Sequence, residues 1–201
     1  MSNMPLYTLI RDRRSIRRYQ DRPVEAEIIE RLLTAATWGP SAHNRQPWRF
    51  AVTTSPDTKQ TLAFAMGTRL RADLTVDHLP AEAIEKDVAR SYDRITKAPV
   101  LILACLSMTD MDHPSDPRRM AFEHIMATQS VAIAIQNLFL AAHAEGLGAC
   151  WMCAPLFCPD VVINTLNLPI DWEPQALITL GYPAENRHAT RQPLDTKILW
   201  R

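Results

Sequence analysis

Glycine is scarce in this sequence, with five glycines among 201 residues. A dinucleotide-binding βαβ unit needs a G-x-G-x-x-G turn directly after a strand, because its glycines let the backbone approach a pyrophosphate. The only G-x-G here, Gly146-Leu147-Gly148, follows a helical pattern and lacks the third glycine. We therefore expect no Rossmann-type site, and we interpret Gly146 as the residue that ends a helix.

An excess of charge of either sign is also absent, since 22 Lys and Arg residues balance 22 Asp and Glu residues. A neutral chain has no general attraction to nucleic acid or to an anionic membrane, so we expect neither partner. Residues 1–15 contain no apolar core long enough for a signal peptide. The longest apolar run, Met120–Leu147, is interrupted by polar residues such as Glu123 and Gln136, so it predicts no membrane span. These absences together predict a cytoplasmic protein.

Cysteine and histidine show no metal-binding spacing. Three of the four cysteines, Cys150, Cys153 and Cys158, lie close together, and without an export signal we expect reduced thiols. Cys150 and Cys153 form a CxxC motif, but residues three apart in a strand point to opposite faces, and no second CxxC accompanies it. The six histidines are scattered. The sequence therefore predicts neither a metal site nor a dithiol centre.

Helical and strand patterns alternate along the chain and predict a layered α+β fold, as one domain over residues 1–201. Helices are expected at residues 6–12, 23–39, 56–67, 81–95, 118–145 and 159–166, and strands at 48–53, 100–107, 149–153 and 175–182. Residues 68–80 are polar and irregular, and we interpret them as a lid or a solvated connector.

The predicted helix Arg118–Glu145 carries Ala and Ile all around its circumference and would be about 40 Å long. A helix that is apolar on most faces must be buried on most faces. In a chain of this length, that requirement predicts a second subunit. The apolar end of the tail, Ile198–Trp200, suggests a further docking contact with another subunit.

Two polar stretches are the candidates for function. Residues 11–18 include five arginines, and they form either a solvated charged turn or a phosphate clamp, because the arginine fork matches a phosphate. Residues 38–48 read WGPSAHNRQPW and connect a predicted helix to a predicted strand. This stretch is either a well-capped loop or a loop that binds a flat ligand with polar edges.

Together the two stretches resemble the nitroreductase family of flavin enzymes. The family's RRSxR-type segment corresponds to Arg13–Arg17, and its P-S-x-x-N-x-Q-P-W loop corresponds to Pro40–Trp48. Later landmarks are GLGACW at Gly146–Trp151 and LGYP at Leu180–Pro183. The resemblance covers nearly the whole chain. It implies a mixed β-sheet flanked by helices, an intertwined two-fold homodimer, and flavin mononucleotide (FMN) bound at the interface.

The resemblance also implies a set of flavin-binding residues: Arg13, Arg14, Ser15, Arg17, Pro40, Ser41, Asn44, Gln46, Pro155, Leu156 and Arg191. Arg13, Ser15 and Arg191 correspond to phosphate and ribityl ligands. Arg17 corresponds to the basic residue beside the pyrimidine oxygen, where a cation stabilises negative charge. The loop Pro40–Gln46 would come from the other subunit. The family's mid-chain basic contacts have no evident counterpart, with Arg69 and Arg71 as the candidates.

The implied activity is reduction of a planar acceptor, such as a nitroaromatic or a quinone, with NAD(P)H as donor. No acid–base pair, nucleophile or metal set emerges from the sequence, so the flavin would carry the chemistry. Donor and acceptor would alternate in one cleft by a ping-pong mechanism, with Trp151, Phe157 and His43 as candidate walls.

Three other functions stay open. The runs SAHNRQPW, RITKAPV and GLGACWMCAPLFCP are similar to the flavin reductase domain of deazaflavin-coenzyme biosynthesis proteins. Reduction of a dehydro-deazaflavin precursor is therefore one alternative. The others are a non-catalytic flavin-binding protein and a flavin-consuming enzyme related to cobalamin-ligand synthesis.

Overall fold

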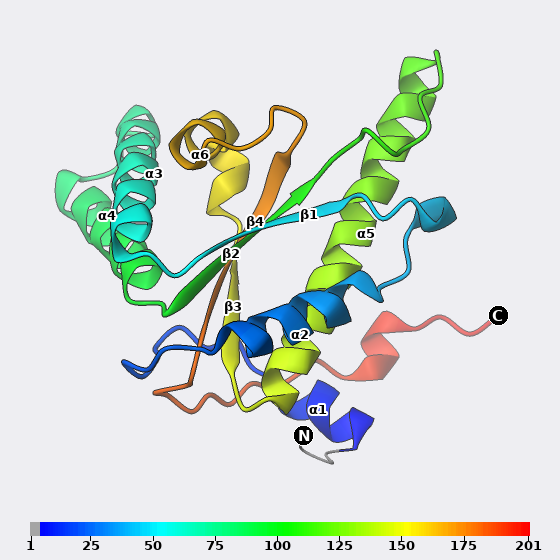
Figure 1. Cartoon of the computed structure of the whole chain (residues 1–201), viewed down its shortest axis with the longest axis horizontal. Helices are drawn as coiled ribbons and strands as arrows, with labels where there is room; N and C mark the ends of the chain where they lie inside the picture. The colour runs from blue at the N-terminus through cyan, green and yellow to red at the C-terminus, as the bar shows by residue number, and fades with distance from the viewer. Residues whose placement is uncertain (1–4) are drawn as a thin grey trace.

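The computed structural model describes residues 5–201, and it contains a four-stranded sheet with helices on both faces (Figure 1). The strands are β1 (Trp48–Thr53), β2 (Val100–Leu106), β3 (Gly148–Met152) and β4 (Glu173–Gly181). The α-helices are α1 (Leu6–Asp12), α2 (Ala26–Thr37), α3 (Pro56–Val76), α4 (Ala81–Thr96), α5 (Pro117–Ala144) and α6 (Pro159–Leu166). Short 3₁₀ turns are η1 (Ala42–Asn44), η2 (Ala154–Phe157) and η3 (Leu194–Lys197).

The strand order is β1-β2-β4-β3, and all three pairings are antiparallel. The strands β1 and β3 therefore form opposite edges of this sheet. A parallel contact is added at the β3 edge by an isolated bridge between Ser15 and Ala149. The predicted combination of parallel and antiparallel pairing in the sheet thus comes from the arginine-rich stretch, which lies beside β3 without forming a named strand.

The two faces of the sheet bury different helices. Strand β2 is buried over its whole length, so its alternate side chains supply both faces. One core contains Ile102 and Ala104 together with residues of α2 and α5. The other contains Leu101 and Leu103 together with residues of α3 and α6. This arrangement gives the three-layer fold that the alternating helix and strand patterns predicted.

Helix α5 is long and apolar enough, by length and composition alone, to cross a membrane. Its buried residues Ala127, Val131, Ala134 and Leu138 recur at helical spacing and belong to the core shared with the sheet. The helix is therefore a core helix of this domain. It nonetheless leaves Phe122 and Ile125 about half exposed, which is unusual for large apolar side chains on one helix.

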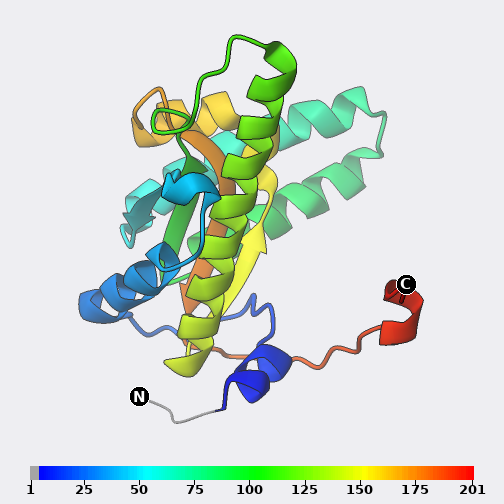
Figure 2. The ribbon, with the colours of Figure 1, turned by 90° about the vertical axis from the view of Figure 1, so that its right-hand side faces the viewer.

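The interpretation of residues 68–80 as an irregular excursion is wrong, because α3 continues through Gly67 to Val76. Gly67 is buried, and a Cβ atom built there would lie 3.3 Å from the side chain of Val88 in α4. The glycine therefore permits close packing of α3 on α4 and does not end the helix. The polar residues after it lie on the outer part of the α3–α4 hairpin, which projects from the sheet (Figure 2).

Candidate functional site

The stretch Arg13–Arg17, here called the arginine segment, is attached to the β3 edge of the sheet. The backbone N–H of Ile16 donates to the carbonyl of Ala149 at 3.0 Å, beside the Ser15–Ala149 bridge. Ile16 is buried, and a Cβ atom at Gly148 would lie 2.6 Å from the side chain of Ile16. Only glycine at position 148 lets the segment approach this closely. The GLGACW run therefore has a packing role at this edge.

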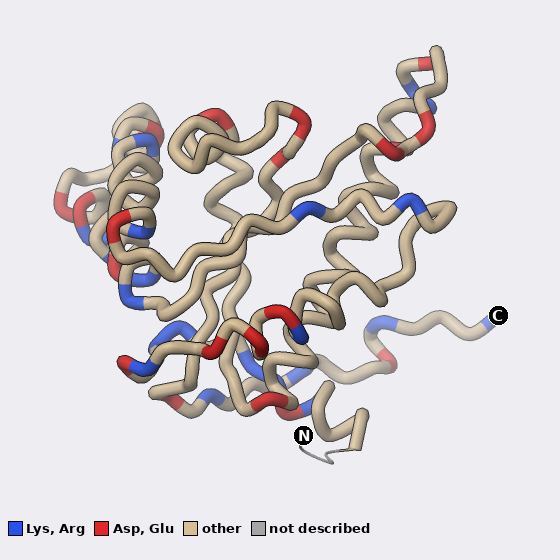
Figure 3. The backbone as a smooth tube through the Cα atoms, viewed as in Figure 1, with Lys and Arg blue, Asp and Glu red and all other residues tan. Residues whose placement is uncertain are grey.

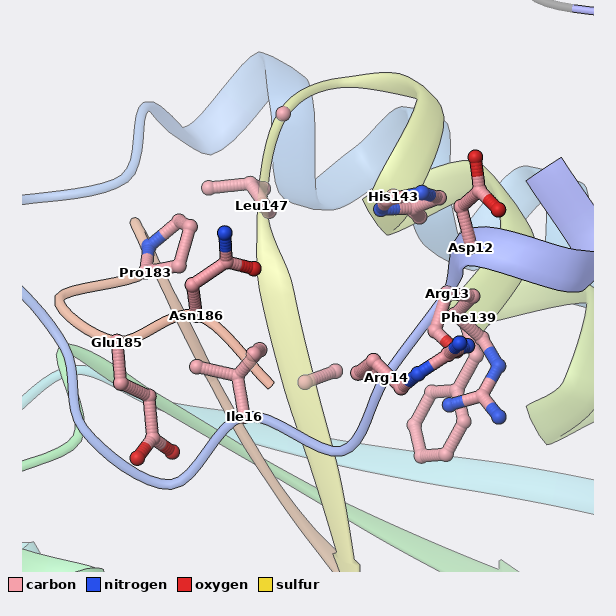
Figure 4. Close-up of a pocket in the computed structure, with 12 residues that line it drawn as sticks. Asp12, Arg13, Arg14, Ile16, Phe139, His143, Leu147, Pro183, Glu185 and Asn186 are labelled. Atoms are coloured by element: carbon pink, nitrogen blue, oxygen red, sulfur yellow. The ribbon is translucent and has the colours of Figure 1, made fainter. Parts of the chain in front are cut away.

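A cavity of about 300 Å³, here called the β3-edge cavity, opens where α1, the end of α5 and the start of β3 meet (Figure 4). Arg13 and Arg14 line it, and the guanidinium of Arg13 lies 6.0 Å from the ring centroid of Phe139. Burial lowers the pKa of Arg13, and the nearby charges of Arg191 and Arg14 lower it further. The structure thus brings three of the predicted flavin-binding residues, Arg13, Arg14 and Arg191, close together. Such a gathering of cations suits an anionic ligand.

Two buried nitrogens in this cavity support the same conclusion. The Nε atom of Arg14 and the Nε2 atom of His143 have no hydrogen-bond partner among the residues that the structure describes. Burial also lowers the pKa of His143, and the charges of Arg13 and Arg14 lower it further. Buried polar atoms are normally satisfied, and an unsatisfied guanidinium nitrogen and imidazole nitrogen beside Arg13 suit the oxygen atoms of a bound phosphate.

Arg17 lies in a second, strongly basic cavity of about 590 Å³, here called the arginine pocket. Its charged lining residues are Arg17, Arg18, Arg90, Asp93, Arg94, Lys97 and Arg187. They come from the arginine segment, from the C-terminal half of α4 and from the loop after β4, which converge in space (Figure 3). Burial lowers the pKa of Arg94, and Arg17 and Arg90 lower it further.

Glu185 fixes the backbone of the arginine segment at this point. The backbone N–H of Arg17 donates to Oε1 of Glu185 at 2.7 Å, and Arg187 pairs with the other carboxylate oxygen at 2.9 Å. The Glu185 side chain is only 13% exposed, so the carboxylate is held between these partners. A charge-assisted hydrogen bond of this kind restricts where the Arg17 side chain can reach.

The loop Pro40–Gln46, here called the polar loop, has a strained backbone. His43, Asn44 and Gln46 all have positive φ values, between 49° and 55°, in the left-handed region that non-glycine residues rarely adopt. Ser41 stabilises this conformation, because its hydroxyl accepts a hydrogen bond from the backbone N–H of Gln46 at 3.0 Å. The hydroxyl of Ser130 in α5 accepts a bond from Ala42 N–H at 3.3 Å. Clustered strain of this kind is characteristic of functional loops.

The polar loop and the arginine segment lie at opposite edges of the sheet. The loop leads directly into β1, whereas the arginine segment lies against β3. Three strand spacings, about 14 Å, separate those edges. Along α5, Ser130 contacts the loop and Phe139 contacts Arg13, a separation of about 14 Å along the helix axis. A single chain therefore does not assemble the two predicted halves into one site.

The remaining predicted residues are distributed as follows. Pro155 and Leu156 lie in η2, directly after β3, with Pro155 buried and Leu156 about half exposed. Phe157 is 74% exposed and lines an apolar cavity of about 390 Å³ between η2 and the α3–α4 hairpin. His43 is in the polar loop, away from this edge, and Trp151 contributes to the α5-side core. The β3 edge thus combines the arginine segment, Arg191 and η2.

Sequence reasoning missed Arg94 and Glu185. The candidates Arg69 and Arg71 instead pair with Asp160 and Glu85, both at 2.7 Å, and neither lines the arginine pocket. The signal for Arg94 was its place in RITKAPV, on the last turn of α4 just before β2. No local pattern identified Glu185, because its role depends on a contact with Arg17 across most of the chain. Among the described residues, no group of three metal-ligand side chains comes together.

Two curated proteins are similar to this chain in sequence over most of their length. The chain is 34% identical, over 92% of its length and 81% of the relative, to a protein of Methanothermobacter thermautotrophicus named as an NADH dehydrogenase/NAD(P)H nitroreductase. It is 30% identical, over 90% of its length and 82% of the relative, to the 5,6-dimethylbenzimidazole synthase of Rhodospirillum rubrum.

The fold of this chain is also similar to that of solved nitroreductase structures. A nitroreductase from Desulfovibrio desulfuricans, crystallised in complex with FMN, superposes with a TM-score of 0.76 and 28% identity, covering 100% of this chain and 98% of that one. The family described as "Nitroreductase family" matches residues 10–182. With that match across most of its length, and with the nitroreductase fold around it, this chain belongs to the nitroreductase family.

Proposed function

We propose that this protein is an FMN-dependent oxidoreductase that uses NAD(P)H to reduce a small planar acceptor. The observation that carries this proposal is the β3-edge cavity, where Arg13 and Arg14 line the wall, the charge of Arg191 acts on Arg13, and two buried nitrogens have no partner among the described residues. These groups fit the phosphate of FMN in charge and in hydrogen-bonding character. When bound, FMN supplies the two-electron chemistry that the chain's own side chains do not.

The chain's residues then bind and orient the cofactor. Arg13, Arg14 and Arg191 hold the phosphate, and Ser15 lies beside the ribityl chain. Arg17 and Arg94 stand at the pyrimidine end, where their charges stabilise negative charge on the ring. From Gly148 to Met152, β3 spans about 13 Å, so it leads from the arginine segment towards the η2 residues that pack against the ring.

A second copy of the chain completes the site. The polar loop is at the opposite sheet edge from the arginine segment, so Pro40, Ser41, Asn44 and Gln46 reach a flavin only on a partner subunit. Phe122 and Ile125 on α5, and Leu199 and Trp200 in the tail, are apolar and exposed in one chain. Their burial in a homodimer removes this apolar surface from water. A flavin-loaded monomer at micromolar concentration in analytical ultracentrifugation contradicts this arrangement.

The test of the function is the response of the purified yellow protein to NADH and NADPH. Anaerobic addition should bleach the flavin absorbance, and a quinone should restore it. Steady-state kinetics should give parallel double-reciprocal lines, because donor and acceptor occupy one cleft in turn. Intersecting lines mean that both bind together, and they overturn the ping-pong mechanism. Flavin that neither donor bleaches contradicts the reductase assignment and favours a binding or storage protein.

A second candidate is supported by the 30% identity to a 5,6-dimethylbenzimidazole synthase. A protein of that kind consumes its flavin. The same bleaching experiment separates the two functions, since a reductase returns intact FMN after reoxidation in air. Mass spectrometry of the released cofactor that detects a benzimidazole in place of FMN favours the synthase. A dehydro-deazaflavin precursor is a further acceptor to test, because the SAHNRQPW run is similar to that of the flavin reductase domain of deazaflavin-coenzyme biosynthesis proteins.

A further inference from the structure

The arginine pocket holds more positive charge than its own carboxylates neutralise. Six Arg and Lys side chains line it, against one carboxylate, Asp93. Lys97 pairs with Asp93, Arg90 with Asp87 and Arg187 with Glu185, at 2.8 to 2.9 Å. In the part of the chain that the structure describes, the other three lining cations, Arg17, Arg18 and Arg94, have no ion-pair partner. This surplus is local, since the whole chain carries no net charge.

Keeping these like charges together has a cost in the free protein. Arg94 is half-buried, and its pKa is lowered by burial and by Arg17, Arg90 and Arg187, with only the thiol of Cys150 acting in the opposite direction. Like charges in a partly buried pocket repel each other. A bound anion removes that repulsion, so the pocket favours a ligand that carries more than one negative charge.

We propose that the arginine pocket binds the phosphates of the nicotinamide dinucleotide, with Arg18 and Arg90 as the principal contacts. This inference rests on the proposed function. Arg17 and Arg94 serve the flavin ring, which leaves two exposed arginines at the same opening: Arg18, and Arg90, whose partner Asp87 does not line the pocket. The donor's pyrophosphate, and the 2′-phosphate of NADPH, bring the required charge within reach of a nicotinamide stacked on the ring.

Two other cavities fit these phosphates less well. The chain has no glycine-rich turn after a strand that could hold a pyrophosphate. The apolar cavity beside η2 has three charged lining residues, Asp73, Asp77 and Arg69, and Arg69 already pairs with Asp160, so the cavity does not suit a polyanion. The β3-edge cavity is occupied by the flavin phosphate in the proposed complex. Of the cavities that contain cations, the arginine pocket has the largest excess of Arg and Lys over Asp and Glu, so it suits the donor's phosphates.

The test uses the FMN-loaded dimer with the double substitution Arg18→Ala and Arg90→Ala. Lys86→Ala is the matched control, because Lys86 is an exposed cation of the same helix that does not line the pocket. Binding of NADP⁺ to the oxidised holoenzyme is measured by titration calorimetry, which requires no turnover. We expect the dissociation constant to rise about tenfold in the double variant and to stay within about twofold in the control. The KM values for NADH and NADPH should rise in parallel.

Three results overturn the inference: unchanged NADP⁺ binding in the double variant, an equal loss of FMN affinity, or a raised KM for an anionic quinone sulfonate with unchanged donor binding. An equal loss of FMN affinity assigns the pocket to the flavin, and a raised KM for the quinone sulfonate assigns it to the acceptor. In the double variant, the KM for a neutral quinone should not change. A holoenzyme that binds NADP⁺ through Arg18 and Arg90 but is not reduced by NADPH contradicts the proposed function and leaves the phosphate subsite intact.

Discussion

The arginine segment and the polar loop are both short, polar and placed between secondary-structure elements, but the fold holds them in different ways. The arginine segment is attached to β3 by a backbone hydrogen bond and is held by Glu185, and among the described residues the side chains of Arg13, Arg14 and Arg17 form no ion pair. The polar loop is held through hydroxyls of Ser41 and Ser130 in a left-handed backbone conformation. The first is built to present charge, and the second to present a fixed shape.

That difference indicates how the site divides between two subunits. Charge acts over several ångströms and tolerates small displacements, whereas hydrogen bonds along a ring edge need a rigid partner. A strained loop supplied across an interface meets that need, because its geometry is fixed before the subunits associate. Five predictions test whether the two stretches divide the work in this way, beginning with the largest effect.

Arg13→Ala should weaken FMN binding by about tenfold to one-hundredfold, because a charge-assisted hydrogen bond to phosphate is worth about 1.5–3 kcal/mol. Fluorescence titration of the apoprotein with FMN measures this loss. Arg11→Ala is the control, since Arg11 is an exposed arginine of α1 that does not line the cavity. Equal FMN affinity in Arg13→Ala and the parent refutes the phosphate assignment.

Mixed dimers test directly whether the two stretches belong to different subunits. Arg13→Ala and Asn44→Ala homodimers should each carry two damaged sites. Unfolding and refolding the two variants together should restore about a quarter of the parental sites, since half of the random dimers then contain one intact site. Recovery is followed by FMN content and by quinone reductase activity. A site formed within one chain gives no recovery above the average of the two homodimers.

Substitution of Glu185 should affect flavin binding through Arg17. Glu185→Ala removes the acceptor for Arg17 N–H, whereas Glu185→Gln keeps an acceptor oxygen and loses only the charge. We expect FMN affinity to fall severalfold in the Ala variant and to be partly rescued in the Gln variant. The reduction potential of the bound flavin should shift in the same order, because it depends on the position of the Arg17 cation. A pair of variants with equal affinity and equal potential argues against a positioning role.

Ser41→Ala should relax the polar loop. The lost hydrogen bond to Gln46 N–H is worth about 0.5–1.5 kcal/mol, which corresponds to a fall in Tm of roughly 1–6 °C in a domain of this size. Thr37→Ala is a nearby control, because its hydroxyl bonds only within the last turn of α2. Thermal unfolding by circular dichroism measures both variants. A Ser41→Ala protein as stable as Thr37→Ala shows that other contacts hold the loop.

The smallest expected effect is the pH dependence contributed by His143. Burial lowers the pKa of His143, with Arg13 and Arg14 acting in the same direction and Asp12 against it. The unfolded chain takes up a proton near the ordinary value of about 6.5, whereas the folded protein does so only at lower pH. The free energy of unfolding therefore falls as the pH drops below about 6.5.

Replacement of His143 with Gln should remove that contribution. Urea unfolding at neutral pH and at about pH 5.5 should show a smaller loss of stability on acidification in His143→Gln than in the parent. The same loss in both proteins excludes His143 as a source of the acid sensitivity.

Local sequence patterns predicted most elements of this fold. The bounds of α1, β1 and α6 agree with the predicted residue ranges, because helical and strand periodicities and their flanking prolines and glycines are local signals. The same signals failed at Gly67, where packing of α3 on Val88 allowed the helix to continue. The two motifs also identified the family, which the comparison across residues 10–182 confirmed.

The tertiary structure alone decided which residues meet. Arg94 joins Arg17, and Glu185 bonds to Arg17, because the loop after β4 and the end of α4 lie against the arginine segment at the β3 edge. The strand order places the polar loop at the opposite edge, although it follows the arginine segment closely in sequence. Periodicity determines which face of an element is buried, but strand order determines its neighbours. Strand order depends on contacts between distant residues that no local pattern encodes.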